Sequence, residues 1–234
     1  MTYSSESAAS VPFANKMQAF QALKIGLRFS YSNWRMWYNY MVVSMDVGQL
    51  NEACRALGRV VEETSGKMGA KSVDEDVLDR LVDGVTKTSG NKEDTDEDLN
   101  RGQRLFRSVS SLFERTILPR VSSSRIFRAY GRLLTWQEKW EEAIKAYLDA
   151  YRNGSAGTME KGETDLDKWK GAVQEVEEVV ELLRNFGPRV EGYHWGLQAR
   201  SIVRTFMGRS KDFEDEVEWS RLRDLQNELR RGDE

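Results

Sequence analysis

The densest concentration of reactive side chains in the sequence is a run of arginines. Residues 101–132 hold eight arginines against one acid, Glu114, whereas residues 74–98 hold ten acids against three basic residues. A guanidinium binds carboxylate or phosphate through forked hydrogen bonds. This run of arginines, called the arginine stripe below, has two interpretations. It binds an acidic peptide or an RNA backbone, or it is a solvated face whose charge is neutralised by the acidic segment before it. We favour the second interpretation. The arginines are Arg101, Arg104, Arg107, Arg115, Arg120, Arg125, Arg128 and Arg132.

Side chains that could support catalysis are few. His194 is the single histidine and Cys54 the single cysteine, which excludes a metal site built from several histidines. The segment DGVTKTSG lacks the Gly-Lys-Ser/Thr that a phosphate-binding loop requires. We interpret His194 as a packed ring and Cys54 as a buried, small apolar residue. We therefore expect no catalytic, cofactor or metal site, and predict that the protein is not an enzyme.

Composition narrows the class of protein further. The chain has 234 residues, 39% of them apolar and 31% charged, and a net charge of −3, which argues against a uniformly basic nucleic-acid binder. The single cysteine excludes an intramolecular disulfide, and the first residues show no cationic start followed by an apolar run. No stretch approaches the roughly 20 apolar residues of a membrane-spanning helix. We expect a cytoplasmic or nuclear protein that does not bind membranes.

The elements that position these residues are predicted to be helices arranged as repeats. There are three prolines, and apolar residues recur at spacings of three and four. Ala53 and Ala19 stand 34 residues apart, and each is followed four residues later by a leucine, Leu57 and Leu23. The same phrase recurs in KWEEAIKAYLDAYR, which contains Ala143. This period is typical of tetratricopeptide repeats, in which two helices, A and B, form a hairpin.

Matching residues precede these phrases. Trp37, Tyr40 and Gly48 stand 16, 13 and 5 residues before Ala53, and an aromatic phrase of similar spacing precedes Ala143. Small residues let the A and B helices approach closely, and rings fill the groove beside them. The residues predicted to pack the repeats are Ala19, Leu23, Trp37, Tyr40, Gly48, Ala53, Leu57, Phe127, Tyr130, Gly131, Ala143, Tyr147 and Ala150.

The predicted fold is therefore all-α: an α-α superhelix, a tetratricopeptide-like solenoid, with an irregular C-terminal helical cap. We predict a disordered start at 1–15, repeats over 16–157 and C-terminal helices over 158–234. Within the repeats we expect a lone B helix at 16–29, a repeat at 34–67, an irregular hairpin at 73–118 with an acidic loop at 87–100, and a repeat at 124–157.

The run from Lys16 to Glu62 resembles a known family. Its most specific part is NWRMWYNYM…SMDVG, Trp34 to Gly48, and the likeness continues more weakly to about Arg230. The sequence is similar to the tetratricopeptide repeat protein 27 family, whose fungal members are named for maintenance of the cell wall. The resemblance implies the C-terminal repeat region of a longer, non-enzymatic scaffold linked with the Hsp90 chaperone system and assembly of the U5 splicing particle.

In such a scaffold, function is expected on the inward face of the A helices. The candidate partner-binding residues are Tyr38, Asn39, Arg125, Arg128 and Arg132. The tetratricopeptide superfamily uses this face as a clamp for a chaperone's C-terminal carboxylate, and Asn39 matches one clamp position. Val42 offers no donor, however, so Asn39 is interpreted as a polar contact of another groove. We predict a scaffold for protein partners; the alternative is an RNA-processing scaffold that contacts RNA through the arginine stripe.

Overall fold

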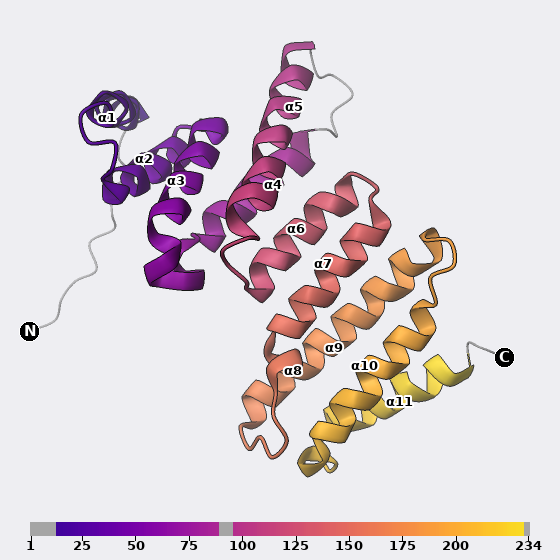
Figure 1. Cartoon of the computed structure of the whole chain (residues 1–234). Coiled ribbons are helices and arrows are strands. Elements are labelled where there is room, and N and C mark those ends of the chain that lie inside the picture. The colour runs from indigo at the N-terminus through magenta and orange to yellow at the C-terminus, as the bar shows by residue number, and fades with distance from the viewer. Residues whose placement is uncertain (1–12, 89–95, 232–234) are drawn as a thin grey trace, which may run out of the picture. The chain divides into compact units, whose positions relative to one another are not determined.

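The computed structural model describes residues 13–88 and 96–231, in which every regular element is a helix (Figure 1). The predicted all-α helical-repeat fold is confirmed. Packing divides the chain into two compact units, Met1–Val121 and Ser122–Glu234, called unit 1 and unit 2 below. Within the described ranges, no helix combines the length and the apolar character needed to cross a membrane.

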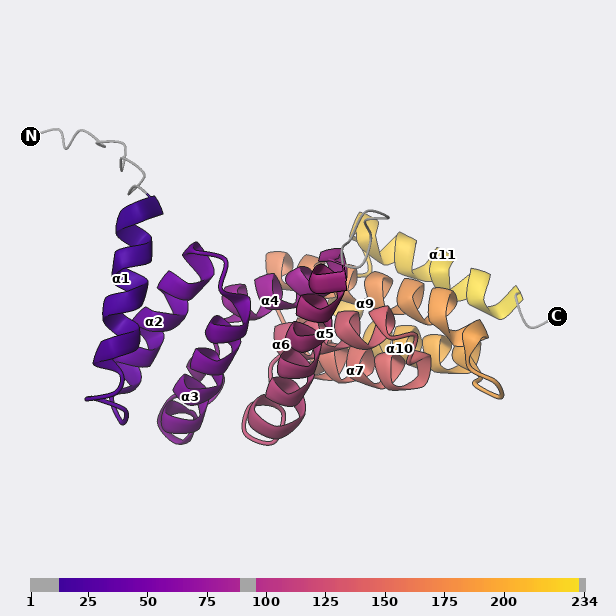
Figure 2. The same cartoon turned by 90° about the horizontal axis from the view of Figure 1, so that it is seen from above.

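Unit 1 is built around a helical hairpin. Its helices are α1 (Phe13–Gly26), α2 (Trp34–Asp46), α3 (Leu50–Met68), α4 (Glu75–Thr88) and α5 (Asp96–Ser111), followed by a π-helical turn, Leu112–Ile117. The Asn33 side chain caps α2 by accepting a hydrogen bond from the backbone N–H of Arg35 at 3.1 Å. Gly48, with φ at +73°, makes the turn into α3. Figure 2 shows α1, α2 and α3 in succession.

The α2–α3 hairpin closes around small and aromatic residues. Ala53 and Leu57 of α3 are fully buried. Trp37 and Tyr40 of α2 are also buried, with 6% and 2% of their surface exposed. The Trp37 indole N–H donates to the carbonyl of Tyr31 at 2.7 Å, so the buried ring keeps its polar group satisfied. The side chain of Ala53 is short enough for the two helix backbones to pack closely.

The repeat pattern predicts that Ala19 of α1 is a packing residue like Ala53, but α1 packs differently. Ala19 is exposed and Leu23 is half-buried, whereas Phe20 is buried and stacks on Tyr40 with ring centroids 5.3 Å apart. An alanine marks a tight contact only where a second helix covers it. Because α1 meets α2 through the face that carries Phe20, the face with Ala19 is left to solvent.

The predicted acidic loop at 87–100 is shorter in the structure. Helix α4 continues to Thr88 and α5 begins at Asp96, so helix occupies both ends of the predicted loop. Acidic residues are favoured in the first turn of a helix, so a charged segment of low complexity can begin one. Residues 89–95, and the predicted disordered start up to residue 12, lie outside the described residues; α1 begins at Phe13.

Unit 2 is a row of helices that follow one another in the chain (Figure 1). They are α6 (Ser124–Trp136), α7 (Trp140–Asn153), α8 (Ser155–Thr158), α9 (Leu166–Phe186), α10 (Trp195–Arg209) and α11 (Val217–Arg231). Helices α6 and α7 form a hairpin in which Gly131 faces Tyr147. A Cβ at Gly131 would lie 2.8 Å from a Tyr147 ring carbon, so the close approach requires glycine.

The core of unit 2 is continuous from α7 to α11. Trp169 of α9 is fully buried at its centre, and its ring stacks on Phe213 with centroids 4.7 Å apart. Ile144 of α7 and Leu229 of α11 belong to the same cluster. The predicted boundary between repeats and C-terminal helices at 157/158 therefore does not mark a break in packing, because α9 uses one apolar face to join both.

Candidate functional site

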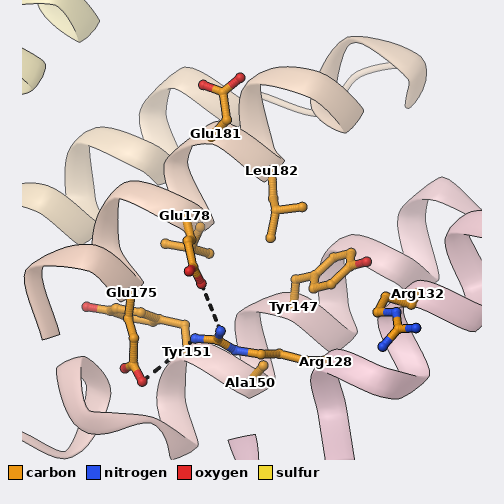
Figure 3. Close-up of a pocket in the computed structure, with 10 residues that line it drawn as sticks. Arg128, Arg132, Tyr147, Ala150, Tyr151, Glu175, Glu178, Glu181 and Leu182 are labelled. Carbon is orange, nitrogen blue, oxygen red and sulfur yellow. Dashed lines mark ion pairs between the residues drawn. The ribbon is translucent and has the colours of Figure 1, made fainter. Parts of the chain in front are cut away.

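A groove in unit 2 is lined by residues of α6, α7 and α9 (Figure 3). Its volume is about 380 Å³. Helices α6 and α9 each open a helical hairpin, so the groove occupies the place where partner-binding residues were expected. The residues that line it are Arg128, Arg132, Tyr147, Ala150, Tyr151, Glu175, Glu178, Val179, Glu181 and Leu182.

Helical spacing directs these side chains into the groove. Arg128 and Arg132 stand four residues apart on α6, and Glu178 and Leu182 stand four apart on α9, so each pair shares one helix face. The opposite face of α9, with residues such as Val176, is buried in the core of unit 2. Helix α9 thus stabilises unit 2 through one face and lines the groove with the other.

The charges in the groove neutralise one another. Arg128 reaches Glu178 at 2.8 Å and Glu175 at 3.7 Å, and both contacts are drawn in Figure 3. A second oxygen of Glu175 accepts a hydrogen bond from the backbone N–H of Ala156 at 2.9 Å. Because its guanidinium is already shared between two carboxylates, Arg128 is held in place rather than available to an acidic ligand. The acids that neutralise Arg128 lie on α9. The predicted neutralisation of the stripe by residues 74–98 stays a prediction, because the side chains of residues 88–101 lie outside the described residues.

The other side of the groove is apolar. Tyr147 stacks on Phe186 with centroids 6.0 Å apart, and Leu182 packs against the same cluster. Burial raises the pKa of Tyr147, whose hydroxyl lies 3.4 Å from the hydroxyl of Thr135. This wall offers a partner a rigid aromatic and aliphatic surface beside a neutralised charge pair.

The arginine stripe is divided between the two units. Arg104 and Arg107 lie on α5 of unit 1, whereas Arg128 and Arg132 lie on α6 of unit 2. Arg120 donates to the carbonyls of Arg115 and Thr116, both at 2.9 Å, and so caps the end of its own helical segment. The other predicted groove arginine, Arg125, is exposed on α6 and is not among the lining residues. The side chain of Arg101 lies outside the described residues.

Sequence reasoning missed the α9 side of this site. Glu175, Glu178 and Glu181 recur every three residues on the polar side of α9, and this spacing is a signal that they share a face. Nothing in the sequence alone indicates that this face meets Arg128, because α6 and α9 are separated by two other helices.

The candidates Tyr38 and Asn39 lie side by side on α2 of unit 1, and both are exposed. The Tyr38 hydroxyl donates to a carboxylate oxygen of Asp74 at 3.2 Å, and the charge of Asp74 raises the pKa of Tyr38. The other oxygen of Asp74 accepts from the backbone N–H of Val77 at 3.1 Å. Asp74 therefore caps α4 and ties it to α2.

We expect the substitution Asp74→Ala to lower the free energy of unfolding of unit 1 by about 1–2 kcal/mol, because the cap of α4 is lost. Tyr38→Phe removes only an exposed hydrogen bond, so its effect should be below about 0.5 kcal/mol. Urea titration followed by circular dichroism measures both changes. Equal effects of the two variants would show that capping by Asp74 contributes nothing.

The remaining reactive residues are placed without a catalytic arrangement. Cys54 is buried, as predicted, and burial raises the pKa of its thiol to about 12. His194 is not the packed ring that was predicted: it is exposed at the start of α10, where the chain turns into the helix. In the described part of the chain, no cluster of three or more histidine, cysteine or acidic residues is arranged to hold a metal ion.

Comparison with known proteins relates the chain to helical-repeat proteins. A TPR repeat-containing protein of Schizosaccharomyces pombe is 28% identical over 209 residues, 87% of this chain. Essential for maintenance of the cell wall protein 1 of Saccharomyces cerevisiae is 24% identical over 241 residues, 98% of this chain. The chain is similar to both proteins over most of its length. The resemblance to the cell-wall maintenance family is thereby confirmed.

Other comparisons define the extent of this relationship. Tetratricopeptide repeat-containing protein trd-1 of Caenorhabditis elegans is 30% identical over 76 residues, 32% of this chain. No model of a known protein family matches the chain. The chain spans about a quarter of the length of its yeast relatives, 24% and 26%.

Proposed function

We propose that the protein is a non-enzymatic scaffold for protein–protein interaction and that the groove of unit 2 holds a segment of a partner. One observation carries this proposal: an aromatic and aliphatic wall, formed by Tyr147 and Leu182, stands beside charges that are already neutralised. A preformed groove binds a helix or extended segment without the cost of ordering the scaffold. The relatives, as tetratricopeptide repeat proteins, support the same class of function.

The resemblance suggests a more specific role. We propose that the partners belong to the Hsp90 chaperone system or to the U5 splicing particle under assembly, in the cytoplasm or nucleus, and that in fungi this work supports the cell wall. The RNA-processing alternative receives less support, because Arg128 is paired with Glu175 and Glu178.

The test is co-purification of the tagged protein followed by mass spectrometry, with Leu182→Glu as the groove variant. A carboxylate at this position should weaken partner recovery at least about tenfold, since it buries a charge against an apolar wall. The matched control is Leu197→Glu, at an exposed leucine of α10 outside the groove, which should leave recovery unchanged.

The salt dependence gives a second readout. Apolar contacts tolerate sodium chloride, whereas contacts to an RNA backbone weaken steeply as salt is raised. We expect the recovered partners to survive high salt with the wild type and to be lost with Leu182→Glu at any salt concentration. Recovery that is equal in both leucine variants would contradict the groove as the binding site.

A further inference from the structure

A second cleft, in unit 1, is lined by positive charge. It runs between α3 on one side and α5 with the π-helical turn on the other, and its volume is about 630 Å³. The residues that line it are Asn51, Cys54, Arg55, Gly58, Arg59, Glu62, Arg104, Arg107, Ser108, Ser111, Leu112 and Thr116. Four of them are arginines and one is an acid.

The two sides of the cleft contact each other. Gly58 of α3 packs against Leu112, because a Cβ on the glycine would lie 3.4 Å from a methyl carbon of the leucine, an ordinary van der Waals distance. The Ser108 hydroxyl lies 3.2 Å from the Asn51 side-chain oxygen across the cleft and 3.0 Å from the carbonyl of Arg104 on its own helix, and its one proton is shared between these two acceptors. Cys54 and Leu112, both buried, are the apolar residues among those that line the cleft.

The arginines of the cleft differ in availability. Arg59 is held by Glu62 at 2.7 Å and by Glu63 at 2.9 Å and lies over the ring of Tyr31, so its charge is neutralised. Arg55 makes a single contact, of 3.3 Å, to Glu52, and its side chain is 69% exposed.

Arg104 and Arg107 differ from Arg55 and Arg59. They stand one turn apart on α5 and both are exposed, and neither forms an ion pair with any side chain that the structure describes, a set that leaves out residues 88–101. An exposed guanidinium fork, next to hydroxyl and amide groups, fits a carboxylate that binds through two parallel hydrogen bonds.

We propose that this cleft binds an acidic segment of a protein partner, rich in aspartate and glutamate. The charge of the cleft favours an anion from both sides, through Arg55 on α3 and through Arg104 and Arg107 on α5. None of the lining residues is aromatic, so the cleft lacks the rings on which proteins stack the bases of single-stranded RNA. The apolar residues Cys54 and Leu112 instead suit the methylene groups of glutamate side chains.

This surface is distinct from the groove of unit 2 in both chemistry and composition. The groove has an apolar wall beside paired charges, whereas the cleft presents Arg104 and Arg107, which pair with no side chain that the structure describes. A partner can therefore bind one site through apolar contacts and the other through charge. A substitution in one unit tests only the site in that unit.

The experiment uses the full chain and a fluorescein-labelled oligoglutamate peptide, with binding followed by fluorescence anisotropy. We expect the double variant R104A/R107A to bind at least about tenfold more weakly, because it removes two charge-assisted contacts to the peptide. Its affinity should also depend less on sodium chloride than that of the wild type. Circular dichroism should show an unchanged fold, since both side chains are exposed.

The matched control is R28A/R80A, which removes two exposed arginines of unit 1 that do not line the cleft. It should bind the peptide within about twofold of the wild type, as expected for screened surface charges. An equal loss in both double variants would overturn the proposal, because binding would then follow net charge. Tighter binding of oligouridine than of oligoglutamate would overturn it as well, in favour of RNA.

Discussion

We expect the substitution Trp169→Ala to lower the free energy of unfolding of unit 2 by about 3–5 kcal/mol. The indole is fully buried among residues from α7 to α11 and stacks on Phe213. Its removal leaves a cavity in the one cluster that joins these helices. The indole N–H has no hydrogen-bond partner in the described structure, so the loss is one of packing alone.

Urea unfolding followed by circular dichroism measures this effect. The control Leu197→Ala truncates an exposed leucine of the same unit and should cost less than about 0.5 kcal/mol. Trp169→Phe retains a ring against Phe213 and should fall between the two. A loss below about 1 kcal/mol for Trp169→Ala would mean that Trp169 does not hold a single core together.

The second large effect is expected at Gly131. We predict that the substitution Gly131→Leu lowers the free energy of unfolding of unit 2 by about 1–3 kcal/mol. A Cβ at this position would meet two atoms of the Tyr147 ring at 2.8 and 2.9 Å. Leucine therefore forces the α6–α7 hairpin apart or displaces Tyr147. Because Tyr147 also lines the groove, partner recovery should fall together with stability.

Gly171→Leu is the matched control, because Gly171 lies in α9 and a Cβ there would meet nothing within 4 Å. Leucine is a better helix former than glycine by up to about 1 kcal/mol, so this variant should be neutral or more stable. We expect Gly131→Leu to lower the midpoint temperature of thermal unfolding and Gly171→Leu to leave it unchanged or raise it. A loss of similar size in both would contradict the close approach at Gly131.

The hairpins could be foreseen because their determinants are local. Ala53 and Leu57 stand one helical turn apart, and rings such as Trp37 recur at fixed distances before them, so spacing alone places them on one buried face. Ala19 has the same local sequence but is exposed, since burial of an alanine depends on a neighbouring helix that the repeat phrase does not encode. The start of α5 was missed because acidic residues are common both in loops and in the first turn of helices.

The groove could be foreseen only in part. Helical repeats predict that residues of α6 such as Arg128 face inward, but not which residues they meet. The contact of Arg128 with Glu178 joins two helices of different hairpins, and its existence depends on how the hairpins stack. For the same reason, no pattern in the sequence predicts that α3 and α5 lie on the two sides of the unit 1 cleft. The sequence does single out Arg104 and Arg107 as members of the arginine stripe.

Site-specific photo-cross-linking tests most directly the claim that the unit 2 groove binds a partner segment. A photoreactive residue at position 182 lies in the groove, and one at position 145 replaces an exposed lysine of α7 outside it. We predict that the partner recovered by co-purification is cross-linked from position 182 and not from position 145. Cross-linking of that partner from position 145, or from both positions equally, would contradict binding in the groove.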